Sequence, residues 1–104
     1  MNVAVANAQA FQEKMDKGGP LVVKFSAQWC GPCKAYAPTV EAVAADHPEI
    51  EFIEIDLDEN PDLAARWNVR SIPATIGFKD GNVAFHAMGI LARSALEKHL
   101  GSLP

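Results

Sequence analysis

Apolar residues recur along this chain with two spacings, one typical of strands and one typical of helices. A short apolar segment, Val3–Val5, predicts a strand, and Asn7 then caps a helix whose apolar residues fall on one face. The continuous apolar run Leu21–Phe25 is rich in β-branched residues and predicts a buried strand. A longer helical pattern begins near Pro32, a residue favoured at the first helical position.

The second half of the chain continues this alternation and ends with a different arrangement. Polar and apolar residues alternate over Glu51–Leu57, as in a strand, and a short helix is predicted over Asp62–Trp67. Two strand-like runs, Ala74–Lys79 and Asn82–Met88, flank Asp80-Gly81, a dipeptide that strongly favours a tight antiparallel hairpin. A final amphipathic helix follows the hairpin.

The order of these elements predicts the fold class. The first crossovers require parallel strands, whereas the hairpin requires antiparallel strands. We therefore expect an α/β fold with a mixed, five-stranded central sheet flanked by four helices. A chain of 104 residues with 49% hydrophobic residues fits one domain, which we expect to span residues 1–104.

Charge and hydropathy narrow the classes of partner. The chain has 9 basic and 13 acidic residues and a net charge of -4, which argues against a nucleic-acid partner. No apolar run approaches the ~20 residues that a membrane span needs, and the N-terminal residues lack the basic flank and apolar stretch of a secretory signal. We therefore expect a cytoplasmic protein that does not enter a membrane. We also expect it to be a monomer.

The only two cysteines stand in the segment Trp29-Cys30-Gly31-Pro32-Cys33-Lys34, where the predicted strand gives way to the predicted helix. The first sulfur lies near the free N–H groups and the positive end of the helix, which favours a thiolate over a thiol. In a reducing cytosol such a pair is more often catalytic or metal-binding than structural. Cys30 is therefore the candidate nucleophile.

This segment and its surroundings resemble the thioredoxin family over nearly the whole chain. A bare C-x-x-C is weak evidence, but the motif within this order of elements is specific. The segments that match the family are Trp29–Lys34, Ala37-Pro38, Asp58–Pro61, Ser71–Pro73, Phe78–Gly81 and Gly89. The resemblance implies a thioredoxin fold and a protein-disulfide reductase whose two cysteines cycle between dithiol and disulfide.

The resemblance also implies a mechanism and its partners. The Cys30 thiolate attacks a disulfide of a target protein, and Cys33 then attacks Cys30 to release the reduced target. Two intervening residues bring both sulfurs within bonding reach, while the outer sulfur stays accessible. The sulfurs carry the electrons themselves, so we expect no cofactor beyond the reversible disulfide, and a thioredoxin reductase as the second partner.

Targets are expected to dock on a surface around the motif. The family has a cis peptide bond where this chain has Ile72-Pro73, and a cis bond there places the Ile72 backbone beside the sulfurs, where it can pair with an extended target. A trans turn is the alternative. We expect a flat apolar patch built from Trp29, Gly31, Pro32, Ile72, Pro73, Met88, Gly89 and Ile90. Core positions for Trp29 and Met88 are the competing interpretation.

Two charged positions depart from the family pattern. Thioredoxins usually have a buried aspartate where this chain has Lys24, and a buried lysine where it has Glu54. Alternation places Lys24 on the face opposite Val23 and Phe25, where a buried charge needs a partner. We hypothesise that Glu54 accepts the proton of Cys33, directly or through water, while Lys24 lowers the pKa of that thiol. A pair kept only for electrical balance is the alternative.

Two other functions stay open at this point. A C-x-x-C pair is also half of a zinc or iron site, although His47, His86 and His99 are scattered and no second C-x-x-C is present. The same fold can also serve as a noncatalytic binding subunit that uses the surface around Trp29 and Pro73. An assay of disulfide reduction separates an enzyme from either alternative.

Overall fold

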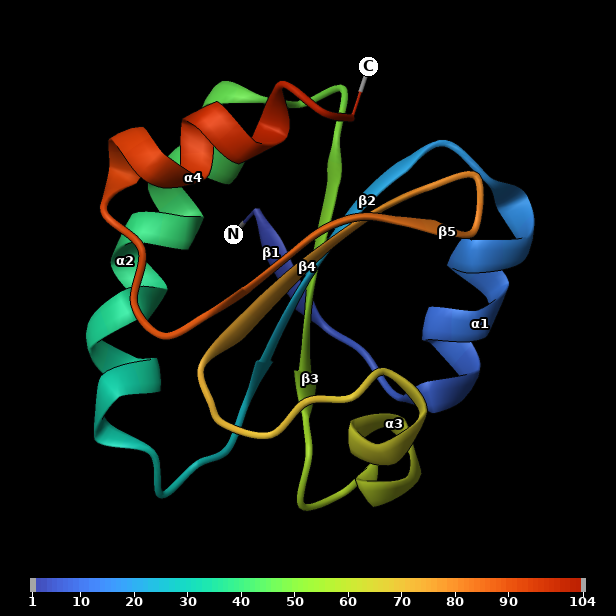
Figure 1. Cartoon of the computed structure of the whole chain (residues 1–104), viewed down its shortest axis with the longest axis vertical. Helices are drawn as coiled ribbons and strands as arrows, with labels where there is room; N and C mark the ends of the chain where they lie inside the picture. Colours follow the sequence, from blue (N-terminus) through green and yellow to red (C-terminus); the bar gives the residue numbers. More distant parts are fainter. Residues whose placement is uncertain (1, 104) are drawn as a thin grey trace.

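The central sheet carries helices on both faces in the computed structural model, which describes residues 2–103 (Figure 1). The two terminal residues of the domain expected over 1–104 lie outside this range. In chain order the elements are β1 (Val3–Val5), α1 (Ala8–Lys17), β2 (Pro20–Ser26), α2 (Gly31–Asp46), β3 (Glu51–Asp56), α3 (Pro61–Arg66), β4 (Ala74–Lys79), β5 (Asn82–Met88) and α4 (Arg93–Leu100). Every predicted element is present, with small differences at the ends.

The sheet is mixed, as predicted, with the strand order β1-β3-β2-β4-β5. Strand β3 runs parallel to β1 and β2, whereas β4 runs antiparallel to both β2 and β5. Asp80 and Gly81 have φ values of 51° and 82°, and positive values at both positions are what a tight two-residue hairpin turn requires. The predicted hairpin between β4 and β5 is therefore confirmed.

Each face of the sheet has its own apolar core. On one face, residues of the strands pack with Tyr36 of α2 and Leu96 of α4. On the other face, strand residues including Val23 and Phe25 pack with Phe11 of α1. Because successive strand residues point to opposite faces, Lys24 lies on the side of α2, as the alternation in the sequence predicts.

One end of the sheet collects the segments that carry the candidate chemistry. Strands β2 and β3 are parallel and both end there. Strand β4 is antiparallel to β2 and begins there, so the loop before β4 reaches the same edge (Figure 1, bottom). Residues 27–30 connect β2 to α2 at this edge. Trp29 and Cys30 thus lie beside the loop that contains Ile72 and Pro73, which is distant in the sequence.

Candidate active site

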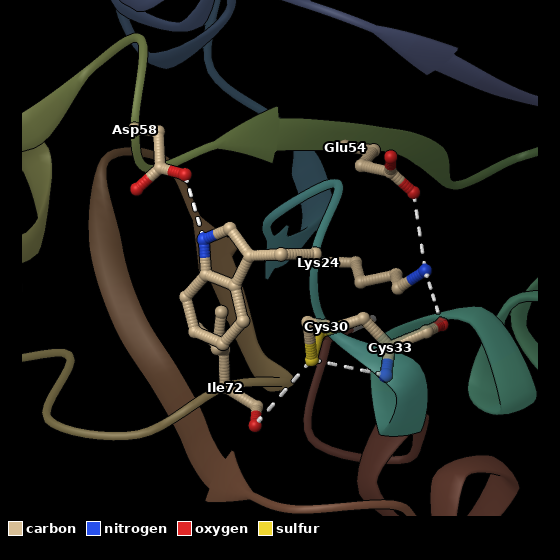
Figure 2. Close-up of a disulfide and its surroundings, with 7 residues drawn as sticks. Lys24, Cys30, Cys33, Glu54, Asp58 and Ile72 are labelled. Carbon is tan, nitrogen blue, oxygen red and sulfur yellow. Dashed lines mark hydrogen bonds and ion pairs between the residues drawn. A yellow bond between two sulfur atoms is a disulfide. The ribbon is translucent and has the colours of Figure 1, made fainter.

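A disulfide joins Cys30 and Cys33 at the start of α2, with their Cα atoms 5.3 Å apart. Cys30 is the N-cap of the helix, and its Sγ accepts a hydrogen bond from the backbone N–H of Cys33 at 3.2 Å (Figure 2). Pro32 occupies the first turn, where its missing N–H leaves no donor unpaired. This amide and the positive end of the helix favour a thiolate at Cys30 once the disulfide is reduced.

The disulfide is more deeply covered than the sequence suggests. Cys30 is 3% exposed and Cys33 is 2% exposed, because Ala27 and Ile72 pack against them. The prediction that the outer sulfur is accessible is therefore wrong for this oxidised form. Cys30 nevertheless borders a groove on the surface of the protein.

That groove has a volume of about 660 Å³ and is lined by Cys30 together with several predicted docking residues. The predicted residues in its lining are Trp29, Gly31, Pro32 and Ile72. Its walls also include the polar residues Asp58, Arg70 and Ser71. The surface beside the disulfide is therefore a groove whose walls are mainly apolar and include some polar groups. The flat apolar patch formed by the full predicted set stays a prediction.

The Ile72-Pro73 loop forms the opposite wall. Its peptide bond is cis, as the resemblance implies, and the Ile72 carbonyl oxygen lies 4.0 Å from the Cys30 Sγ. Pro73 is buried, so its side chain is not available to a target, contrary to the prediction. Its carbonyl oxygen instead accepts a hydrogen bond from the Gly89 N–H at 2.7 Å, which ties the loop to the end of β5.

Three large apolar side chains are exposed at this end of the molecule. Trp29 is 71% exposed, and Met88 and Ile90 are each 54% exposed, which excludes core positions for Trp29 and Met88. Ile90 and Gly89 do not line the groove beside Cys30. The structure therefore brings part of the predicted docking set to the groove and leaves the rest outside its walls.

Asp58 holds the exposed tryptophan in place. The indole N–H of Trp29 donates a hydrogen bond to Asp58 Oδ2 at 2.7 Å (Figure 2). The sequence pattern alone assigns no such contact to Asp58. The contact follows from the parallel register of β2 and β3, in which Ser26 pairs with Asp56. Both strands end near this pair, so the segments that follow them, with Trp29 and Asp58, lie at the same edge of the sheet.

Lys24 lies buried beneath the start of α2, with an exposed fraction of 3%. Its Nζ is 3.1 Å from Glu54 Oε1 and donates to the Cys33 carbonyl oxygen at 3.0 Å (Figure 2). The predicted ion pair between neighbouring strands is therefore confirmed. The lysine also contacts the Cys33 backbone, which the sequence did not predict. The Glu54 side chain is 32% exposed, so water can solvate its carboxylate.

A second groove of about 490 Å³ borders the other cysteine. Cys33 lines it together with Lys24, Ser26 and Glu54, so this cysteine and the ion pair border the same groove. The two cysteines thus border different grooves.

On the sheet side of α2, burial raises the pKa of Tyr36, whose hydroxyl oxygen lies 2.8 Å from Thr75 Oγ1. This phenol stays neutral beside Lys24 at neutral pH.

Metal-binding groups and membrane-spanning helices are both absent from residues 2–103. No cluster of three or more His, Cys, Asp and Glu side chains there could hold a metal ion. His47 instead contacts Glu49 and Glu97. Within the same residues, none of the helices combines the length and the apolar character needed to cross a membrane.

Comparisons with known proteins agree with this geometry. The family model for thioredoxin matches residues 2–102. A thioredoxin of Pseudomonas aeruginosa is 38% identical over 99 residues, which cover 94% of this chain and 92% of that protein. A thioredoxin of Staphylococcus aureus is 42% identical over 95 residues, covering 86% and 90%. The crystal structure of Fasciola hepatica thioredoxin superposes with a TM-score of 0.87 at 34% identity, covering 98% of this chain and 99% of that chain.

Proposed function

Because this chain belongs to the thioredoxin family, we propose that Cys30 is the attacking thiol and Cys33 the resolving thiol of its thiol–disulfide exchange. The chain is a thiol–disulfide reductase that acts on disulfide-containing proteins. One observation carries the assignment of roles. Cys30 caps α2 and borders the groove of about 660 Å³, which we call the docking groove. Cys33 lies inside the helix and borders the groove of about 490 Å³ that Lys24 and Glu54 also line.

The exchange proceeds in two displacements. The Cys30 thiolate attacks one sulfur of the target disulfide, a new sulfur–sulfur bond forms, and the other target sulfur leaves as a thiolate. The Cys33 thiolate then attacks Cys30, which releases the target dithiol and leaves the Cys30–Cys33 disulfide present in this structure. The Cys33 N–H that contacts the Cys30 sulfur stabilises the Cys30 thiolate before the first displacement, whereas in the second displacement the target sulfur is the leaving group.

We assign the proton of Cys33 to Glu54 and a supporting electrostatic role to Lys24. The Cys33 thiol has to lose its proton before it attacks, and Glu54 is the carboxylate of the ion pair on the same groove. Water in this groove carries the proton to the partly exposed carboxylate. Lys24 is fixed by its bonds to Glu54 and to the Cys33 carbonyl, and its positive charge favours the thiolate of Cys33.

The pH dependence of the second displacement tests these roles. A mixed disulfide is formed with a target peptide, and the rate at which Cys33 resolves it is measured by stopped flow against pH. Glu54→Gln and Lys24→Met are each expected to shift the profile. Glu59→Gln is the matched control, because Glu59 lines the same groove but the carboxylate paired with Lys24 is that of Glu54. Profiles that match wild type in both variants would rule out the assignment.

The docking groove fits an extended segment of a target. Nothing lies within 4 Å of the position that a Cβ would take on Gly31, so a target backbone can come close to the disulfide there. Trp29 and Pro32 offer apolar surface, and the Ile72 backbone offers hydrogen bonds to an added strand. Pro73 and Gly89 hold this wall through their backbone bond, and Ile90 extends the apolar rim.

Several properties follow as proposals from the same chemistry. A thioredoxin reductase regenerates the dithiol, and no cofactor is required because the sulfurs carry the electrons. The chain acts as one domain and as a monomer in the cytoplasm, a compartment whose reducing poise keeps a dithiol of this kind available.

Insulin reduction tests the function and separates an enzyme from a noncatalytic binding subunit. With dithiothreitol as electron donor, wild type is expected to accelerate insulin precipitation, and Cys30→Ser and Cys33→Ser are expected to lose turnover. A wild-type rate equal to that of dithiothreitol alone would exclude the reductase. Trp29→Ala is the companion variant, in which docking is weakened but both sulfurs remain.

A further inference from the structure

We propose that Met88 is an oxidation site, at which a peroxide converts the thioether into a sulfoxide and thereby weakens the docking of target proteins. The inference rests on the docking surface of the proposed function and adds a covalent modification to it. Three observations carry it: the exposure of Met88, its contact with Ser71, and its position beside the loop that flanks Cys30.

Met88 lies at the end of β5, on the same edge of the sheet as the disulfide. Its register partner is Ala74, the residue that directly follows Pro73, and the next residue, Gly89, bonds the Pro73 carbonyl. With 54% of its surface exposed, Met88 presents an apolar side chain where an incoming target would cover it. A change in the polarity of this side chain therefore alters the exposed apolar surface next to the docking groove.

A hydrogen bond connects this sulfur to the wall of the groove. The Ser71 hydroxyl lies 3.4 Å from Met88 Sδ and donates to it. Ser71 lines the docking groove and precedes Ile72, whose carbonyl oxygen is 4.0 Å from the Cys30 sulfur. Met88 is thus linked through a single residue to the segment that would pair with a target.

Exposure makes the proposed oxidation selective, and the chain contains an internal control. Met15 is 8% exposed and packs in the core between α1 and the sheet, so a peroxide has little access to its sulfur. Met88 is accessible in the folded protein. Oxidation under native conditions is therefore expected at Met88 long before it occurs at Met15.

The chemistry is a transfer of one oxygen atom. A lone pair of the Met88 sulfur attacks hydrogen peroxide, an S–O bond forms, the O–O bond breaks, and water leaves after proton transfer. The sulfur is oxidised and the peroxide is reduced. The sulfoxide is a strong acceptor on a surface that was apolar, and burying it against a target without a matching donor weakens binding. Methionine sulfoxide reductases reverse the change.

The test uses the whole protein in its disulfide form, in which both cysteines are protected from peroxide. After treatment with hydrogen peroxide, the masses of tryptic peptides are measured by mass spectrometry to follow the added oxygen at Met88 and Met15. The disulfide is then reduced, and KM is measured for insulin and for a small aromatic disulfide. We expect Met88 to react at least about tenfold faster than Met15, and KM for insulin to rise about tenfold while KM for the small disulfide stays the same.

Met88→Leu is the matched variant, and each protein is compared with its own untreated sample. Peroxide should leave the KM of Met88→Leu unchanged, and a methionine sulfoxide reductase should restore the KM of treated wild type. Equal oxidation of Met88 and Met15, full oxidation of Met88 without a change in KM, or the same rise in KM in Met88→Leu would each overturn the proposal. Failure of untreated wild type to reduce insulin would instead overturn the proposed function, and the peptide masses would still test the oxidation site.

Discussion

Replacing Glu54 should destabilise the protein more than replacing Lys24, although each change breaks the same ion pair. Lys24 is 3% exposed, whereas the Glu54 side chain is 32% exposed. In Glu54→Gln the buried ammonium keeps only neutral acceptors, the Cys33 carbonyl and the new amide. Breaking a fully buried pair costs about 3–5 kcal/mol. Since the carboxylate side is open to water and Gln can still accept a hydrogen bond, we expect a loss of about 2 kcal/mol.

Lys24→Met has the opposite consequence. It removes the buried charge, fills most of the same volume, and leaves a carboxylate that water can solvate. The expected loss is below about 1 kcal/mol. For the same reason, the double variant should be more stable than Glu54→Gln alone.

Urea unfolding of the oxidised proteins at pH 7, followed by circular dichroism, measures all these free energies on one scale. The matched control is Glu59→Gln, which should stay within about 0.5 kcal/mol of wild type. A loss in Lys24→Met equal to or greater than that in Glu54→Gln would refute the reasoning. It would mean that the lysine is stabilised mainly by groups other than Glu54.

Three further predictions concern other parts of the fold. Ala92 starts α4 without a side-chain cap, so Ala92→Ser should raise the free energy of unfolding by about 0.5–1 kcal/mol in urea, and no gain would show that these N–H groups are already satisfied. The hydrogen bond to Glu97 raises the pKa of His47 above its unfolded value, so this stabilisation is present at pH 5.5 and lost as the pH rises through the folded-state pKa. Between pH 5.5 and 8.5, wild type should lose about 0.5 kcal/mol more than His47→Gln, and equal losses would contradict this. Gly77→Ala would place a Cβ 2.1 Å from the Phe85 ring and should lower the free energy of unfolding by about 2 kcal/mol, whereas a neutral result in thermal melts would mean that the ring moves freely.

Features set by short segments were predictable from the sequence. Asp80-Gly81 identified the hairpin because the dipeptide itself favours the positive φ values that the turn adopts. The pairing of Lys24 with Glu54 was also predictable, because alternation placed the lysine on one face and a buried charge needs a counterion. Cys30 at the start of α2 followed from the order of a strand, a motif and a helix.

Features set by packing between distant segments were not predictable in the same way. The burial of Cys30 depends on Ile72, which the loop before β4 brings into contact with it. The pattern of residues in the sequence does not show how much of the Cys30 surface such a distant residue covers. The resemblance to the family placed Pro73 in the docking surface, yet the residue is buried. The bond between Trp29 and Asp58 depends on the register of two parallel strands, which the sequence alone does not determine.

Trapping of a mixed disulfide tests the roles of the two cysteines most directly. Reduced Cys33→Ser and reduced Cys30→Ser are each mixed with a protein that contains one disulfide, and the covalent adducts are identified by intact mass and peptide mapping. Cys33→Ser should accumulate a one-to-one adduct through Cys30, because the thiol that would resolve it is missing, and Cys30→Ser should accumulate little. Equal adducts in both variants, or an adduct only in Cys30→Ser, would contradict the assignment of Cys30 as the attacking thiol.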